Sequence, residues 1–136
     1  MVCDRESVGK YSAELHDQAR DKVKVNGVRI VFPNVCFEVW ILLHFQKTVA
    51  AYDGCDDLLK KSPLKKHGKG YDKGEKLEFA EEEVSAARKN AENLNKQTIA
   101  AANSGWNKEH QWNPYADIYK LLDAIDSFGK THITGI

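Results

Sequence analysis

Residues 34–45 of this 136-residue chain read NVCFEVWILLHF, and this stretch decides the fold. From Val35 to Phe45 only Glu38 and His44 are polar, so the segment has no hydrophilic face. A segment that is apolar on all sides must be buried on all sides. Periodicity alone leaves helix and strand open, but the length and Asn34 as N-cap favour a helix. We therefore expect this segment at the centre of the core.

The residues before it predict a strand, a helix and a second strand. An apolar opening, Met1–Cys3, indicates the first strand. Apolar residues then recur in three- and four-residue steps from Val8 to Val23, which predicts an amphipathic helix with Ser7 as N-cap, ended by Asn26-Gly27. The β-branched run at residues 28–32 indicates the second strand. Together they predict a parallel βαβ unit with a right-handed crossover.

The residues after it predict a basic loop followed by two helices. Seven lysines lie between Lys60 and Lys76 among glycines, which is typical of an exposed loop. Apolar residues from Leu77 to Thr98 keep a three-four alternation, which predicts a long helix with a narrow apolar seam. Asn113-Pro114 is a strong start signal for a last helix running to Phe128. We expect these two helices to pair as an antiparallel hairpin.

The sequence thus predicts a helix-rich α/β fold in one domain, residues 1–136. Residues 1–50 would hold the small parallel sheet, 51–76 the basic loop region and 77–136 the helical hairpin. Lys+Arg and Asp+Glu each number twenty, so the net charge is zero and a polybasic surface over the whole molecule is excluded. No apolar run approaches the ~20 residues of a membrane span.

The three cysteines are odd in number and widely spaced. This favours reduced thiols in a cytoplasmic protein, and without a CxxC pair we do not expect a structural zinc site. No Ser/His/Asp spacing or nucleotide-binding glycine motif appears.

Four polar residues are the first candidates for chemistry. Asp4 and Glu6, just after the first predicted strand, could share a divalent metal such as Mg²⁺, or could simply favour the N-terminus of the next helix. Glu38, inside an apolar segment, could act as an acid or base, or could pair with a lysine or a helix end. His44 could support a site or be a satisfied core histidine.

The basic loop is a candidate contact for nucleic acid. Lys65, Lys66 and Lys69 could bind phosphates, and Tyr71 could stack on a base. The alternative is a solvated charged loop, and the acidic run at residues 81–83 argues against a uniform positive face.

With these residues laid out, the chain resembles the RloB/AbiLii family, in three blocks. The first is Val2-Cys3-Asp4-Arg5-Glu6, which is similar to the family's strand ending in an Asp-Arg-Asp type motif. The second and most specific is residues 34–45, similar to the family's Asn-Pro-Cys-Phe-Glu-Leu-Trp-Leu-Leu-Leu-His-Phe signature, with Val35 in place of proline. The third is Asn113-Pro114-Tyr115 and the helix after it, and Tyr71-Asp72-Lys73 is a weaker match.

The resemblance implies a Toprim-like fold and a phage-defence protein of a restriction operon or abortive-infection system. It implies Mg²⁺- or Mn²⁺-dependent cleavage of nucleic acid, with the metal held by Asp4 and Glu6. Glu38 would be a further ligand or base, and His44 and Lys73 would support the site.

Family members have a strand and a glutamate upstream of the first block, which this chain lacks. Whether Met1 is the native start stays open. We expect the first strand to lie at a sheet edge, which is covered either in a homodimer or in another way.

Two other functions remain open. The chain could be a non-catalytic interaction subunit that docks on an ATPase or effector partner, using the seam of residues 77–98 and the basic loop. It could also bind nucleic acid without cleaving it, with an affinity that falls steeply with salt.

Overall fold

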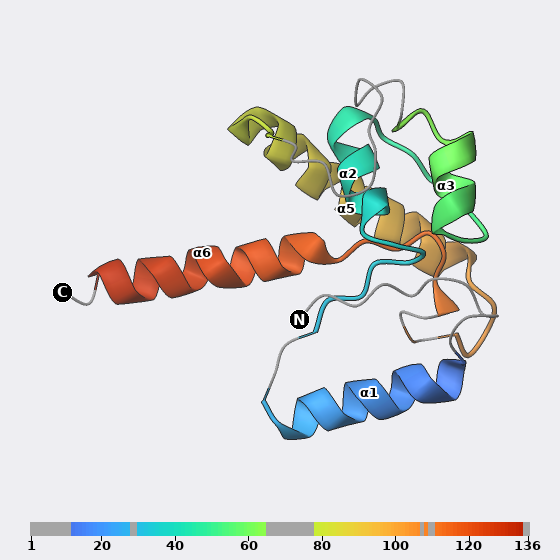
Figure 1. Cartoon of the computed structure of the whole chain (residues 1–136). Helices are drawn as coiled ribbons and strands as arrows, with labels where there is room; N and C mark the ends of the chain where they lie inside the picture. Colours follow the sequence, from blue (N-terminus) through green and yellow to red (C-terminus); the bar gives the residue numbers. More distant parts are fainter. Residues whose placement is uncertain (1–11, 28–29, 65–77, 107, 109–110, 135–136) are drawn as a thin grey trace.

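The computed structural model describes residues 12–27, 30–64, 78–106, 108 and 111–134 (Figure 1). Five helices are formed within these ranges: α1 (Ala13–Val25), α2 (Glu38–Phe45), α3 (Cys55–Lys61), α5 (Glu81–Ala101) and α6 (Ile118–Thr134). In the view of Figure 1, α2, α3 and α5 lie together, while α1 and α6 extend beyond them.

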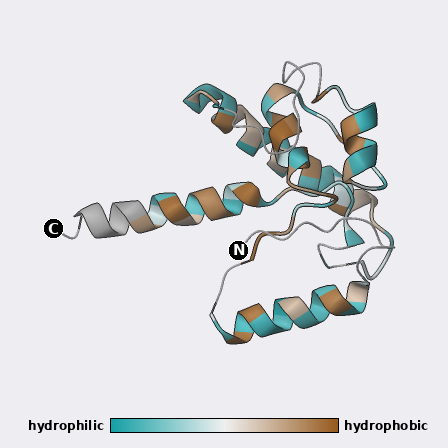
Figure 2. Ribbon diagram, viewed as in Figure 1, coloured by the Kyte–Doolittle hydropathy of each residue, from teal (hydrophilic) through white to brown (hydrophobic). Residues whose placement is uncertain are grey.

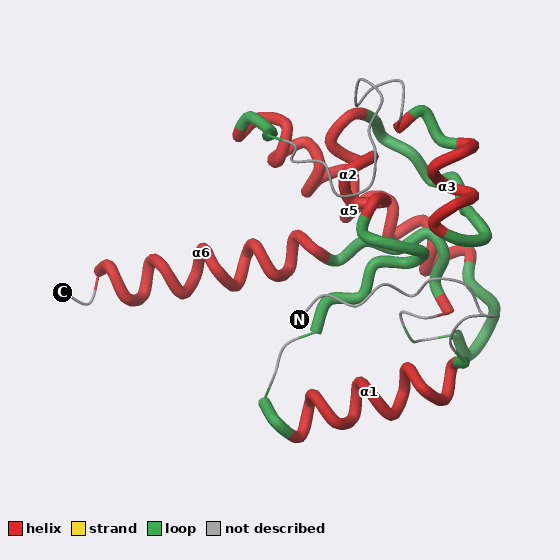
Figure 3. Tube along the Cα trace, viewed as in Figure 1, coloured by secondary structure: helices red, strands yellow, loops and turns green. Residues whose placement is uncertain are grey.

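The predicted βαβ sheet is wrong for the described part of the chain, which contains no strand (Figure 3). Its first strand, residues 1–3, lies outside the described residues. Two residues past the predicted second strand, the chain pairs with a segment that is distant in sequence. Asn34 and Tyr115 exchange backbone hydrogen bonds of 2.8 and 3.1 Å in one antiparallel bridge. The Phe32 N–H donates to the Asp117 carboxylate at 2.6 Å, so a side chain takes a donor that a sheet ladder would need.

The core forms where α2 packs against α5. This confirms that the apolar segment lies at the centre of the core. Every residue of α2 except Phe45 is buried. The helix begins at Glu38, four residues after the predicted N-cap, because Asn34 is held in the bridge to Tyr115. α5 meets α2 with the predicted seam, in which Ala87, Ala91 and Leu94 are buried. Two alanines one turn apart let the backbones approach closely.

Two asparagine side chains of α5 form hydrogen bonds with the end of α2 and with the segment before α6. Asn90 donates to the Leu43 carbonyl at 2.9 Å, which satisfies one of the last carbonyls of α2. Asn95, buried on α5, donates to the Ala116 carbonyl at 2.7 Å and accepts from the Ala116 N–H at 2.9 Å. The chain around Ala116 is therefore held against α5 before α6 begins.

Within the predicted helical hairpin, α5 packs chiefly against α2, and α6 meets α5 through the ion pairs of Arg88 with Asp123 and Asp126. α6 begins at Ile118, because Pro114 and Tyr115 belong to the bridge segment rather than to the first turn. Only its first turns, with Tyr119, Leu121 and Leu122, pack against the core. Beyond them α6 projects away from the other helices (Figure 1).

α1 confirms part of the first predicted helix, but the apolar side of this helix is not buried. Ser12, not Ser7, caps it by accepting from the Leu15 N–H at 3.3 Å, and it ends at Asn26-Gly27 as predicted. None of its residues is buried. Among the described helices, none combines the length and apolarity needed to cross a membrane.

Candidate functional site

Glu38 lies in a buried cluster with two cysteines. Cys36 immediately precedes α2, where its carbonyl accepts from the Val39 N–H at 3.1 Å, and Cys55 is the first residue of α3. Cys36, Glu38 and Cys55 are 0%, 3% and 7% exposed. The Cys55 Sγ lies 3.3 Å from Glu38 Oε2, and all three ligand atoms lie within 4.8 Å of one another. Two sulfur atoms and a carboxylate thus meet in a water-excluded site.

The prediction of three reduced thiols is wrong in this structure, because Cys36 and Cys55 form a disulfide with a Cα–Cα distance of 5.7 Å. Sequence reasoning missed the pair because nineteen residues separate the two cysteines and their approach depends on how α3 packs against α2. The signal within the sequence was the position of Cys36 two residues before the one carboxylate of the apolar segment.

His44 is a buried, satisfied side chain at the other end of α2. Its Nδ1–H donates to the Trp40 carbonyl at 2.9 Å. Its ring stacks on Phe79, with centroids 4.0 Å apart, and meets Trp40 edge-on at 4.7 Å. Burial lowers the pKa of His44 below 6.5, against a smaller opposing effect of the hydrogen bond to Trp40. The ring is therefore neutral at neutral pH.

Glu38 and His44 are not brought together. Six residues apart on one helix, they are separated by about 9 Å along its axis and lie on different faces. Each is instead surrounded by its own neighbours, the cysteines for Glu38 and two aromatic rings for His44. A catalytic role for either residue stays a prediction.

The other predicted site residues lie outside the described part of the chain. They are the metal pair Asp4 and Glu6, the loop residues Lys65, Lys66, Lys69 and Tyr71, and Lys73.

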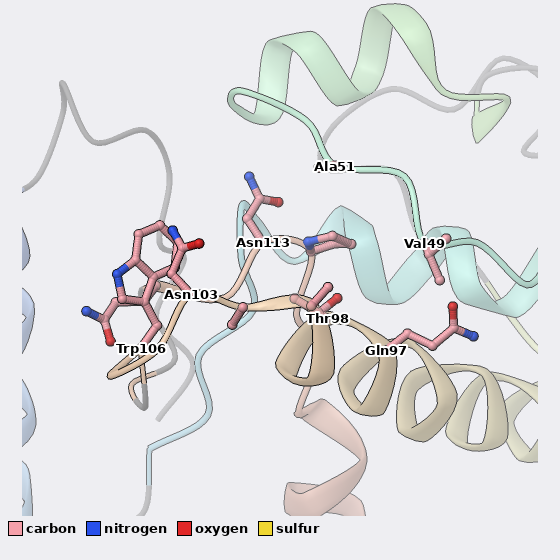
Figure 4. A pocket seen from close by; sticks show the side chains of 11 residues that line it. Val49, Ala51, Gln97, Thr98, Asn103, Trp106 and Asn113 are labelled. Carbon is pink, nitrogen blue, oxygen red and sulfur yellow. The ribbon is translucent and has the colours of Figure 1, made fainter.

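A surface pocket of about 350 Å³ lies beside the C-terminal half of α5 (Figure 4). Trp106 and Asn103 stand at one end, and Val49 and Gln97 at the other. Asn113 also lines it, with its Nδ2 donating to the Tyr52 carbonyl at 2.8 Å. Among the described residues, the side chains that line the pocket are neutral.

The projecting part of α6 exposes large apolar side chains. Ile125 is 56% and Phe128 is 64% exposed, and apolar positions recur along the helix in Figure 2. Arg88 of α5 forms ion pairs with Asp123 and Asp126 in the middle of α6, at 2.6 and 3.1 Å. The chain thus presents an amphipathic helix whose first turns pack against the core and on which Ile125 and Phe128 are exposed.

Comparison with protein families gives a match over most of the chain. The family model described as RloB-like protein matches residues 1–125. Neither the search of curated proteins nor the search of solved structures returned a match.

Proposed function

The chain belongs to the RloB-like protein family, and from this membership we propose that it is a phage-defence subunit, associated with a restriction operon, that docks on an ATPase partner through α6. The observation that carries the docking role is the exposure of Ile125 and Phe128 on a helix that projects from the core.

Burial of these side chains would supply the association energy. Large aromatic side chains at the centre of an interface carry much of the binding free energy. Phe128 offers such a side chain, and Ile125 lies three residues before it, so the two share one face of the helix. An amphipathic helix presented in this way fits an apolar groove on a partner.

The two ion pairs between Arg88 and α6 support the docking role. Because Arg88 holds Asp123 and Asp126, the direction in which the helix leaves the core is defined before binding. A presented helix that is already ordered loses less conformational entropy on binding than a disordered tail.

The test uses the full chain co-expressed with the candidate ATPase partner. We expect a complex by light scattering after size-exclusion chromatography. Phe128→Asp and Ile125→Asp should each weaken it by about 2 kcal/mol, roughly 30-fold in Kd. The matched control is Leu15→Asp, the same kind of change at an exposed position on α1, which should leave the Kd unchanged.

Two outcomes would reject this docking role. One is a wild-type chain that forms no complex with the ATPase, and the other is a complex that both α6 variants retain. A homodimer that the α6 variants abolish would assign the same surface to a second copy of the chain instead.

A second candidate function is Mg²⁺-dependent cleavage of nucleic acid. It is favoured by the extent of the family match, which begins at residue 1 and so includes Asp4 and Glu6. Carboxylates that hold Mg²⁺ can activate a water molecule and stabilise a leaving oxygen. In this proposal Lys65, Lys66 and Lys69 bind the phosphates of the substrate.

The test is cleavage of single-stranded DNA, duplex DNA and RNA with Mg²⁺ or Mn²⁺. Asp4→Ala should abolish cleavage without changing the circular dichroism spectrum, and Asp21→Ala, an exposed carboxylate on α1, should not affect it. Cleavage that survives in Asp4→Ala would show a contaminating nuclease or another site. No cleavage of any substrate, alone or with the ATPase, would leave docking as the function.

A further inference from the structure

We propose that Cys36, Glu38 and Cys55 form a binding site for a thiophilic divalent cation of the zinc class when the two cysteines are reduced. The inference is independent of α6 and of Asp4 and Glu6. It rests on the two sulfur atoms of the Cys36–Cys55 disulfide and one carboxylate, which meet at the junction of α2 and α3.

The spacing of the ligand atoms fits one ion. Around tetrahedral zinc, with bonds of about 2.3 Å to sulfur and 2.0–2.2 Å to oxygen, neighbouring ligand atoms lie about 3.3–3.8 Å apart. The three ligand atoms here all lie within 4.8 Å of one another, and Cys55 Sγ and Glu38 Oε2 are already 3.3 Å apart. In the proposed site, reduction frees the two sulfurs to move apart to this ligand spacing around an ion.

Backbone structure holds the ligands in place. Cys36 and Glu38 are two residues apart at the start of α2, where the Val39 N–H and the Cys36 carbonyl form a hydrogen bond. Cys55 begins α3, and the Leu58 N–H donates to the Gly54 carbonyl at 3.0 Å. The site therefore does not have to be assembled from flexible loops.

Burial favours a cation at this position. The three side chains are at most 7% exposed, so two thiolates and a carboxylate there would repel one another in a low-dielectric surrounding. A bound divalent cation offsets this repulsion. Three ligands of a tetrahedral zinc leave one position for water or another ligand.

The disulfide and the metal exclude each other. Thiol–disulfide exchange with a reducing dithiol transfers two electrons to the Cys36–Cys55 bond, gives two thiols and leaves the reagent as a disulfide. Binding of the cation then displaces the two thiol protons. Reoxidation by a disulfide reagent would reverse these steps and release the ion, so the redox state of the pair controls occupancy.

The test is titration of the reduced full chain with Co²⁺ under anaerobic conditions. We expect one ion per chain, with the near-ultraviolet charge-transfer absorption of thiolate–cobalt bonds, displaced by Zn²⁺. Cys36→Ser and Cys55→Ser should lose this absorption, and Glu38→Gln should weaken binding by about tenfold or more. Cys3→Ser is the matched control and should bind as the wild type does.

Oxidised wild-type protein makes the test independent of whether a core variant folds. With the disulfide intact the same chain should bind no Co²⁺. The proposal is overturned if the reduced protein gives no thiolate–cobalt absorption, if the oxidised protein gives the same absorption, or if Cys3→Ser removes it.

Discussion

His44 makes stability depend on pH, because burial lowers the pKa of its ring in the folded chain below 6.5. Between the folded and unfolded pKa values the unfolded state binds more protons, so the free energy of unfolding falls as pH falls through this window. This loss begins as pH drops past about 6.5 and is complete below the folded pKa.

We expect His44→Phe to remove this part of the pH dependence while keeping a ring to stack on Phe79. The measurement is urea unfolding between about pH 5 and pH 8. Leu15→Phe, which introduces the same ring at an exposed position of α1, is the control and should keep the wild-type slope. A His44→Phe curve parallel to that of the wild type would contradict the assignment.

Asn95 and Asn93, two asparagines of α5, should differ in how much they contribute to stability. Asn95→Ala leaves both the N–H and the carbonyl of buried Ala116 without their partner, at about 1–3 kcal/mol for each group. The buried Nδ2 of Asn93 makes no hydrogen bond. Asn93→Ala should therefore change the free energy of unfolding by under about 1 kcal/mol. Chemical denaturation measures both, and equal losses would refute the role given to Asn95.

At the scale of the element, the contact of α2 with α5 depends on small side chains. Ala87→Leu inserts a larger side chain where the helices meet and should cost about 1–3 kcal/mol through displaced packing. Ala86→Leu adds the same atoms at an exposed position of the same helix and should be neutral within about 0.5 kcal/mol. Thermal unfolding compares the two. If Ala86→Leu destabilises as much, helix propensity rather than packing explains the loss.

The elements that could be predicted from sequence are those fixed by local patterns. The seam of α5 is buried at Ala87, Ala91 and Leu94 because a helical period and a nearby apolar helix suffice to define it. The strand expected at residues 28–32 depends on a distant partner, which the sequence does not specify. Asn34 bridges to Tyr115, eighty-one positions away in sequence, so its expected capping role is lost.

In the candidate site, too, one residue could be predicted from local sequence and its neighbours could not. Glu38 was identified because a carboxylate in an apolar segment is unusual in any fold. Its neighbours Cys36 and Cys55 were not recognised as a pair, since the sequence spacing matched no familiar metal motif and α3 itself was expected to be loop. A polar residue within one apolar segment can be recognised from the sequence. A contact between two distant segments can be recognised only from the tertiary structure.

At the scale of the whole molecule, Arg88 determines how α6 leaves the core. Its two ion pairs are partly exposed, so each should contribute no more than about 1 kcal/mol to stability. Their larger effect is on order, because they hold Asp123 and Asp126, which lie just past the α6 residues that pack against the core. Arg88→Met should thus lower the midpoint of unfolding little while loosening the helix.

Hydrogen–deuterium exchange measures this difference directly. We expect faster exchange of α6 amides at residues 120–128 in Arg88→Met, with no change in α2, because α2 is held by the core and not by the ion pairs. High salt should produce the same change in the wild type, since screening weakens exposed pairs. Lys89→Met, which removes the neighbouring exposed cation of α5, should leave α6 unchanged. Uniformly faster exchange across α2 and α6 would instead assign Arg88 to global stability, and the fixed direction of the docking helix would lose its support.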